Sequence, residues 1–189
     1  MNIAIFGGSF DPPHLGHEAV IKSALANLDI DRLIIVPTFL SPFKSKFSAP
    51  PDVRMRWCAD LWWNLDPKIT ISDYEICQNR AVFTIDSVQY FKSKFDARKI
   101  YLIIGADQLE NLHKWHKFNE LKELVSFVVA YRDGANLGVN LGINLQKLDI
   151  NVKISSSQIR TQMDFRLVPS LILSSVKNFY KEKNAKQNR

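Results

Sequence analysis

Short, almost uninterrupted apolar runs recur along the chain and alternate with stretches of helical period. Runs such as IYLII and LIIVP are typical of strands that are covered on both faces, as in a parallel sheet. Six strands are predicted, at residues 2–6, 32–36, 68–72, 99–104, 125–131 and 150–154.

The stretches between these runs have the pattern of amphipathic helices. Within residues 14–28, four apolar residues fall at positions i, i+3, i+4 and i+7: Ile21, Ala24, Leu25 and Leu28. Helices are predicted at residues 14–28, 52–65, 84–95, 118–124, 155–163 and 169–181. The alternation of strands and helices predicts an α/β fold with a doubly wound, mostly parallel sheet flanked by helices.

No shift in composition marks a boundary, so a single domain over residues 1–189 is predicted, with residues 182–189 as a basic, frayed tail. Two loops stand out. Residues 37–52 contain four prolines and no helical period, which is typical of a functional loop. Residues 134–146 nearly repeat Asn-Leu-Gly and are interpreted as a surface loop or a weak strand pair, without an assigned function.

The composition is that of an ordinary globular protein, with 46% hydrophobic and 23% charged residues. No apolar run approaches the roughly 20 residues that span a bilayer, and the first residues have the pattern of a strand rather than of a signal peptide, so a cytoplasmic protein is expected. The net charge of +6 is compatible with a nucleic acid, with a phosphorylated small molecule or with no specific partner. The sequence has no stripe rich in arginine and aromatic residues, the pattern that would favour binding of a nucleic acid.

The stretch GGSFDPPHLGH, residues 7–17, combines the residue types of a phosphate site. Glycines after a strand allow positive φ and a close approach of a ligand, and Asp11 is expected to cap a helix that begins near His14. His14 and His17 then share one helix face and can donate hydrogen bonds to a phosphate. Two alternatives stay open at this point: both rings lie idle on the surface, or they bind zinc, for which no third ligand stands at a suitable spacing.

The stretch resembles the motif of the HxGH nucleotidylyltransferase superfamily, in which a Gly-rich turn precedes Phe-Asp-Pro and His-x-Gly-His. The resemblance implies the Rossmann-like fold of nucleotidylyl transferases. It also implies that His14 and His17 are catalytic, contacting nucleotide phosphates and stabilising the transition state. The further ATP-binding residues that it implies in this stretch are Gly7, Gly8, Ser9 and Phe10.

A second motif, ISSSQIR, spans residues 154–160. Ser155 and Gln158 have the spacing of a capping box, which alone predicts only the start of a helix. The segment is similar to the superfamily's Ile-Ser-Ser-Thr-x-Ile-Arg, with Ser157 in the place of threonine. The resemblance implies that Ser156 and the helix N-terminus bind the β- and γ-phosphates of ATP, and that Arg160 is a charged, catalytic partner.

The middle of the chain resembles the bacterial nicotinate-nucleotide adenylyltransferase family. PTFLSPFK is similar to a Pro-rich loop of that family, with Lys44 matched but Phe43 in place of a histidine. FTIDSVQYF, IIGADQLENLHKWHKFNEL and VVAYRDG are similar to three further segments. The mononucleotide-binding residues that this implies are Lys44, Thr84, Trp115 and Arg132.

Gly105 and Asp107 are implied as ATP-binding residues at the end of the IYLII strand, where Asp107 would accept hydrogen bonds from ribose hydroxyls. Without the resemblance, Trp115 is equally well explained by core packing. Without the resemblance, Lys44 and Arg132 would be interpreted as solvated surface charges. His113 and His116 are interpreted as surface residues.

The resemblance implies that ATP and nicotinate mononucleotide react to nicotinate adenine dinucleotide and pyrophosphate, a step of NAD biosynthesis, by direct in-line attack. Mg²⁺ would accompany ATP, held by phosphate oxygens and water, with no metal site made of protein side chains. The expected partners are small molecules rather than nucleic acid or membrane, and a homodimer is considered. The alternatives are a nicotinamide-mononucleotide or phosphopantetheine adenylyltransferase and, in another class, a non-catalytic nucleotide- or nucleic-acid-binding domain.

Overall fold

The computed structural model describes residues 1–42, 45–131, 142–143, 145–150, 152 and 154–187. Six strands form one sheet in the order β3-β2-β1-β4-β5-β6, and every neighbouring pair is parallel. This confirms the predicted doubly wound sheet. The strands are β1 (Asn2–Gly8), β2 (Arg32–Pro37), β3 (Ile69–Ile71), β4 (Lys99–Gly105), β5 (Ser126–Tyr131) and β6 (Leu145–Asp149).

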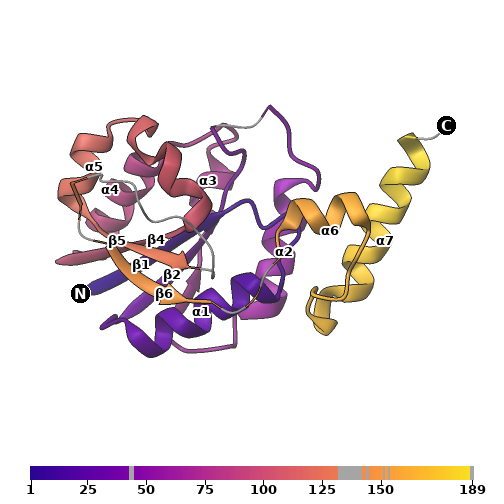
Figure 1. The fold of residues 1–189 in the computed structure, drawn as a ribbon, viewed down its shortest axis with the longest axis horizontal. Helices are drawn as coiled ribbons and strands as arrows, with labels where there is room; N and C mark the ends of the chain where they lie inside the picture. The colour runs from indigo at the N-terminus through magenta and orange to yellow at the C-terminus, as the bar shows by residue number, and fades with distance from the viewer. Residues whose placement is uncertain (43–44, 132–141, 144, 151, 153, 188–189) are drawn as a thin grey trace.

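Helices cover both faces of the sheet, with α1 on one face and α4 and α5 on the other (Figure 1). The α-helices are α1 (Leu15–Asn27), α2 (Pro51–Trp62), α3 (Tyr74–Cys77), α4 (Thr84–Lys94), α5 (Phe118–Leu124), α6 (Ser156–Gln162) and α7 (Ser170–Gln187). A 3₁₀ helix, η1 (Ala106–Lys114), follows β4 directly. Among the described residues, no helix is long and apolar enough to cross a membrane.

Alternate residues of β1 enter two different cores. Ala4 and Phe6 pack with Ile21 of α1, whereas Ile3 and Ile5 pack with the opposite cluster, which includes Val88 of α4. Burial on both faces explains why the central strands are continuous apolar runs. A third cluster joins α2, α6 and α7 beside the sheet.

The direction of the strand order reverses at β1, which has β2 on one side and β4 on the other. In open α/β sheets, ligands bind beyond the carboxyl ends of the strands at such a switch point. β1 ends at Gly8 and β4 at Gly105. The fold therefore brings the first motif and the Gly105–Asp107 segment to the same edge.

Two predicted elements differ from the observed ones, and two observed elements had no counterpart in the prediction. The last strand lies at Leu145–Asp149 instead of residues 150–154. β6 is an edge strand with one buried side chain, so it lacks the continuous apolar run of the central strands. Helix α7 continues to Gln187, beyond the predicted end at residue 181 and into the expected tail. Neither α3 nor η1 was predicted.

Candidate active site

One cavity of about 740 Å³ opens at the carboxyl edge of the sheet, a volume within the usual range of small-molecule sites. Its walls come from the ends of β1 and β4, the starts of α1, α4 and α6, and η1. Twelve of the fourteen sequence-predicted site residues line it: Gly7, Gly8, Ser9, Phe10, His14, His17, Thr84, Gly105, Asp107, Trp115, Ser156 and Arg160. The other two, Lys44 and Arg132, lie outside the described residues, as does Phe43.

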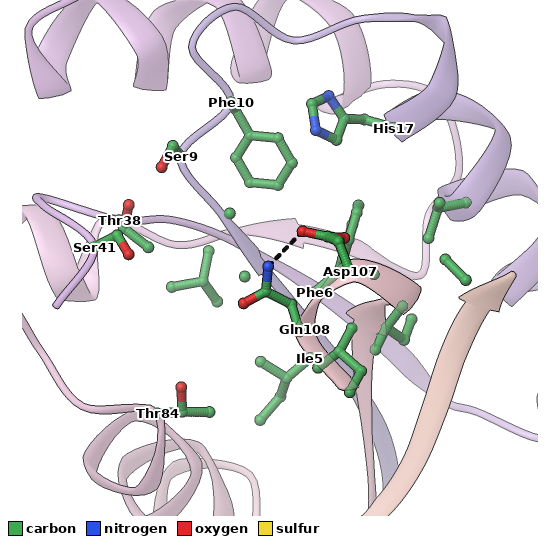
Figure 2. A pocket seen from close by; sticks show the side chains of 18 of the residues that line it. Ile5, Phe6, Ser9, Phe10, His17, Thr38, Ser41, Thr84, Asp107 and Gln108 are labelled. Carbon is green, nitrogen blue, oxygen red and sulfur yellow. Dashed lines mark hydrogen bonds between the residues drawn. The ribbon is translucent and has the colours of Figure 1, made fainter. Parts of the chain in front are cut away.

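The cavity has two ends. Figure 2 shows Ser9, Phe10 and His17 together at one end and Thr84, at the start of α4, at the other, with Asp107 and Gln108 between them. The Gln108 amide donates a hydrogen bond of 2.5 Å to the Asp107 carboxylate. Asp107 also folds back against Gly105 so closely that a Cβ at Gly105 would collide with the carboxylate.

The two motif histidines form a reciprocal cap at the start of α1. His14 is the N-cap residue; its Nδ1 accepts a hydrogen bond from the backbone N–H of His17, and Nδ1 of His17 accepts from the backbone N–H of His14. The two rings are stacked with their centroids 3.6 Å apart. Since a neutral imidazole has one N–H, an accepting Nδ1 leaves the proton on Nε2, which makes Nε2 the hydrogen-bond donor of each ring.

Gly16 makes room for this arrangement. A Cβ at Gly16 would lie 3.0 Å from two atoms of the His14 ring and 3.2 Å from Cγ2 of Ile154. His14 is 2% exposed, so its ring has little space to move away. The glycine between the two histidines therefore lets the first ring pack beneath the helix start and next to the second motif.

The second motif contacts the first directly. Ser155 caps α6 in a capping box with Gln158, as predicted. The Ser156 hydroxyl donates to the carbonyl of Pro12 at 2.9 Å, and the Arg160 guanidinium donates to the carbonyl of Asp11. Residues 144 positions apart thus meet beside the histidines, and Arg160 is fixed with its charge at the cavity wall.

Two details of the predicted motif are wrong. Asp11 does not cap α1; its buried carboxylate accepts hydrogen bonds from the backbone N–H groups of Ser48 and Ala49 and from the Tyr180 hydroxyl. Gly7 and Gly8 do not use positive φ, because both belong to β1, and the left-handed residue of the turn is Phe10, at φ 45°. The carboxylate therefore anchors the loop to α7 rather than to α1.

Comparisons with known proteins show which proteins this chain resembles. A family model described as cytidylyltransferase-like matches residues 5–162. A relative from Campylobacter fetus subsp. fetus, named probable nicotinate-nucleotide adenylyltransferase, is 58% identical over 98% of this chain and 100% of its own length. A relative of the same name from Sulfurimonas denitrificans is 44% identical over 97% of each chain.

This chain belongs to the nicotinate-nucleotide adenylyltransferase family. Solved structures of similar fold include the Plasmodium falciparum nicotinic acid mononucleotide adenylyltransferase complexed with NaAD, with a TM-score of 0.72 and 20% identity over 97% of this chain and 96% of that one. A putative nicotinate-nucleotide adenylyltransferase from Vibrio parahaemolyticus has a TM-score of 0.66 and 21% identity over 94% and 99% of the two chains. At these identities the likeness shows a shared fold.

The far end of the cavity in this family member is aromatic. Trp115 lines it and is half-buried, and its indole Nε1 is buried without a hydrogen-bond partner among the described residues. Phe83 and His116 stack with their ring centroids 4.2 Å apart and also line the cavity. His116 is exposed, as predicted, yet its place in the cavity wall had no signal in the sequence.

Arg54 was not predicted as a site residue; it lies on α2 at 1% exposure. Its guanidinium donates to the backbone carbonyls of Ala49, Ser9, Thr38 and Phe39. Burial lowers the pKa of Arg54, and the nearby Asp11 carboxylate opposes this shift. A signal existed, because Arg54 falls on the same helical stripe as the buried Trp57 and Cys58.

A second missed residue, Glu75 of α3, is 6% exposed and lines the cavity. The Ser87 hydroxyl of α4 donates to it at 2.7 Å. Burial raises the pKa of Glu75 from 4.5 to about 7, and the hydrogen bond from Ser87 acts in the opposite direction. No local pattern in the sequence marks this residue.

The raised pKa of Glu75 predicts a loss of stability with rising pH. Below about pH 4.5 the Glu75 carboxyl is protonated in both the folded and the unfolded state. Between about pH 4.5 and about pH 7 it is protonated in the folded state only. The free energy of unfolding should therefore fall by about 3 kcal/mol across this window. Glu75→Gln should lack this contribution, so urea unfolding at pH 5 and pH 8 should show a smaller decrease for the variant. Equal decreases for the two proteins would contradict the assignment.

Proposed function

We propose that this chain transfers the adenylyl group of ATP to nicotinate mononucleotide, releasing pyrophosphate and forming nicotinate adenine dinucleotide in NAD biosynthesis. The observation that carries the proposal is the two-ended cavity. His17 and Thr84 lie at opposite ends. His14 stacks on His17, and Ser156 and Arg160 contact the same motif, so these groups can meet phosphates at one end. At the other end, the stacking of Phe83 on His116 brings Thr84 and Trp115, their neighbours in the chain, together. The printed names of relatives at 42–58% identity support the same substrates.

The proposed reaction needs no nucleophile from the protein. An oxygen of the acceptor's 5′-phosphate attacks the α-phosphorus of ATP, a new P–O bond forms, and the bond to the β-phosphate oxygen breaks. The attacking group is already an anion, so the protein contributes alignment and stabilisation of charge. Nε2–H of His14 and of His17 would donate to phosphate oxygens near the reacting centre.

Arg160 and the serines of the second motif would stabilise the triphosphate and the leaving pyrophosphate. Arg160 is already oriented by the carbonyl of Asp11 and by the Ser157 hydroxyl, so little freedom is lost when a phosphate binds. Mg²⁺ would enter as a part of the substrate MgATP, carried by phosphate oxygens and water. Among the described residues, no group of three or more His, Cys, Asp or Glu could hold a metal ion.

At the other end, the face of Trp115 would stack on the pyridine ring and Thr84 would lie beside its substituent. Asp107 would accept from the ribose hydroxyls of ATP, since it follows β4 between the two ends (Figure 2). The binding of the mononucleotide by Lys44 and Arg132 stays a prediction. A homodimer and a cytoplasmic location are likewise proposals, which sedimentation of the purified chain and cell fractionation would test.

The function is tested by pyrophosphate release from MgATP with one of three acceptors: nicotinate mononucleotide, nicotinamide mononucleotide or phosphopantetheine. The fastest release is expected with nicotinate mononucleotide, and the dinucleotide product should be identified by mass. A faster reaction with either of the other acceptors would replace the proposed substrate. If no acceptor yields pyrophosphate, the chain is not an adenylyltransferase of this kind.

A further inference from the structure

Glu75 is a buried carboxyl group that lines the cavity and has no part in the proposed reaction. Of the described residues that are buried and polar or charged, Glu75 and Asp11 are the two carboxyls, and Asp11 faces the loop anchor instead of the cavity. Burying a carboxyl group is unfavourable when it is ionised. The position of Glu75 at the wall of a ligand site therefore calls for a functional explanation.

Glu75 lies at the end of the cavity where the acceptor is proposed to bind. The Ser87 hydroxyl, which donates to it, is on α4 one turn after Thr84, and both α4 residues line the cavity together with Trp115. The N-cap residue of α4, Phe83, has no side-chain hydrogen bond to the helix. The positive end of the α4 dipole is thus not capped by the side chain of its N-cap residue. This helix end therefore favours the binding of a negatively charged group of the acceptor.

Among the residues that the structure describes, no cation forms an ion pair with Glu75. The groups on α3 and α4 and next to them are Tyr74, Asp73, Arg80, Ser87 and Asp86. Those in or after η1 are Asp107, Lys114 and His116. Strand β2 packs apolar residues such as Ile34 and Val36 against this region. Burial and the Ser87 hydrogen bond are the causes that set the pKa of Glu75 at about 7. The carboxyl group therefore changes its charge near neutral pH.

We propose that Glu75 determines acceptor selectivity: its neutral carboxyl group admits a pyridine ring with a negatively charged substituent, and its ionised form repels that ring and favours an uncharged carboxamide. This inference rests on the proposed function. Two negative charges near each other in a half-enclosed site repel more strongly than in water, because the effective dielectric constant is lower. A neutral Glu75 can also donate a hydrogen bond to a carboxylate, whereas ionised Glu75 can only accept.

The test measures kcat/KM for nicotinate mononucleotide and for nicotinamide mononucleotide from pH 6 to pH 8.5. The ratio of the two values cancels the titration of the acceptor phosphate and of the histidines, which both acceptors share. For the unmodified chain, the ratio of the nicotinate value to the nicotinamide value should fall by about tenfold as the pH rises. Repulsion of about 1.4 kcal/mol between ionised Glu75 and the negatively charged substituent corresponds to that factor. Dissociation constants without ATP, measured by quenching of tryptophan fluorescence, should follow the same trend.

Three variants isolate Glu75. Glu75→Gln removes the charge but keeps an oxygen that can accept from Ser87, so its ratio should not depend on pH. Ser87→Ala removes the hydrogen bond that favours the ionised form, so the midpoint of the change should move to higher pH. Glu120→Gln is the matched control, because Glu120 is an exposed carboxylate that accepts from Gln89 of α4 but does not line the cavity.

The outcomes separate this inference from the function on which it rests. If the ratio for Glu75→Gln follows the same pH profile as that of the unmodified chain, Glu75 does not set the selectivity, although the proposed function stands. The inference would also be overturned if Glu120→Gln altered the pH dependence of the ratio as much as Glu75→Gln does. Any carboxylate near α4 would then be enough to produce the effect. Absence of turnover with both acceptors in the unmodified chain would contradict both proposals.

Discussion

Replacement of His17 by alanine is expected to lower kcat about 10²–10³-fold, the cost of one lost electrostatic contact to a reacting phosphate. The variant should stay folded, since the loss of one acceptor in a helix cap costs about 1 kcal/mol. Steady-state pyrophosphate release gives kcat, and circular dichroism reports the fold. Turnover close to that of the unmodified chain would remove the role assigned to His17.

Two further variants separate catalysis from helix capping. His17→Asn keeps a side-chain oxygen that can accept from the backbone N–H of His14, but it lacks the Nε2 donor. A loss of kcat in this variant as well would show that the donor matters and the cap does not. His113→Ala is the matched control, because His113 belongs to the other H-x-x-H pair, is exposed and does not line the cavity.

Arg54→Ala is expected to be the most destabilising single change, at about 3–5 kcal/mol. Four backbone carbonyls would lose their donor, and the buried Asp11 carboxylate would lose its nearby positive charge. Two of those carbonyls belong to Ser9 and Thr38 at the cavity wall, so ATP turnover should fall as well. The midpoint of urea unfolding measures the effect.

Arg56→Ala provides the comparison for Arg54, since Arg56 is exposed two positions along the same helix. It should change the free energy of unfolding by less than about 0.5 kcal/mol. Arg54→Lys should lie between the two, because a single ammonium group cannot serve carbonyls that surround a planar guanidinium. Equal stability of the Arg54→Ala and Arg56→Ala variants would show that the buried network contributes little.

Much of the fold could be predicted because the central strands are buried on both faces and are continuous apolar runs. β6 was placed wrongly because, of its five residues, only Leu148 is buried. α3 has four residues, too few to show a helical period, and η1 has a 3₁₀ geometry that the 3.6-residue pattern does not describe.

The candidate site was predictable where its residues stand in motifs. Residues 7–17 and 154–160 supply the groups that we propose to contact phosphates. The two segments meet through Pro12 and Ser156, a tertiary contact that no local pattern encodes. Arg54 and Glu75 were missed because each acts through burial. The environment of a side chain is set by the fold, so the raised pKa of Glu75 has no trace in its sequence neighbours.

The contacts of Ser156 and Arg160 with the first motif also bear on how the protein is made. A ribosome releases residues 7–17 early, yet their partners follow 144 and 149 positions later. Closing so long a segment costs entropy before its contacts are gained, which slows assembly. During synthesis the nascent chain can form β1 and α1 well before α6 completes the end of the cavity where we propose that the triphosphate binds. The capacity to bind ATP should therefore arise late, almost together with completion of the fold.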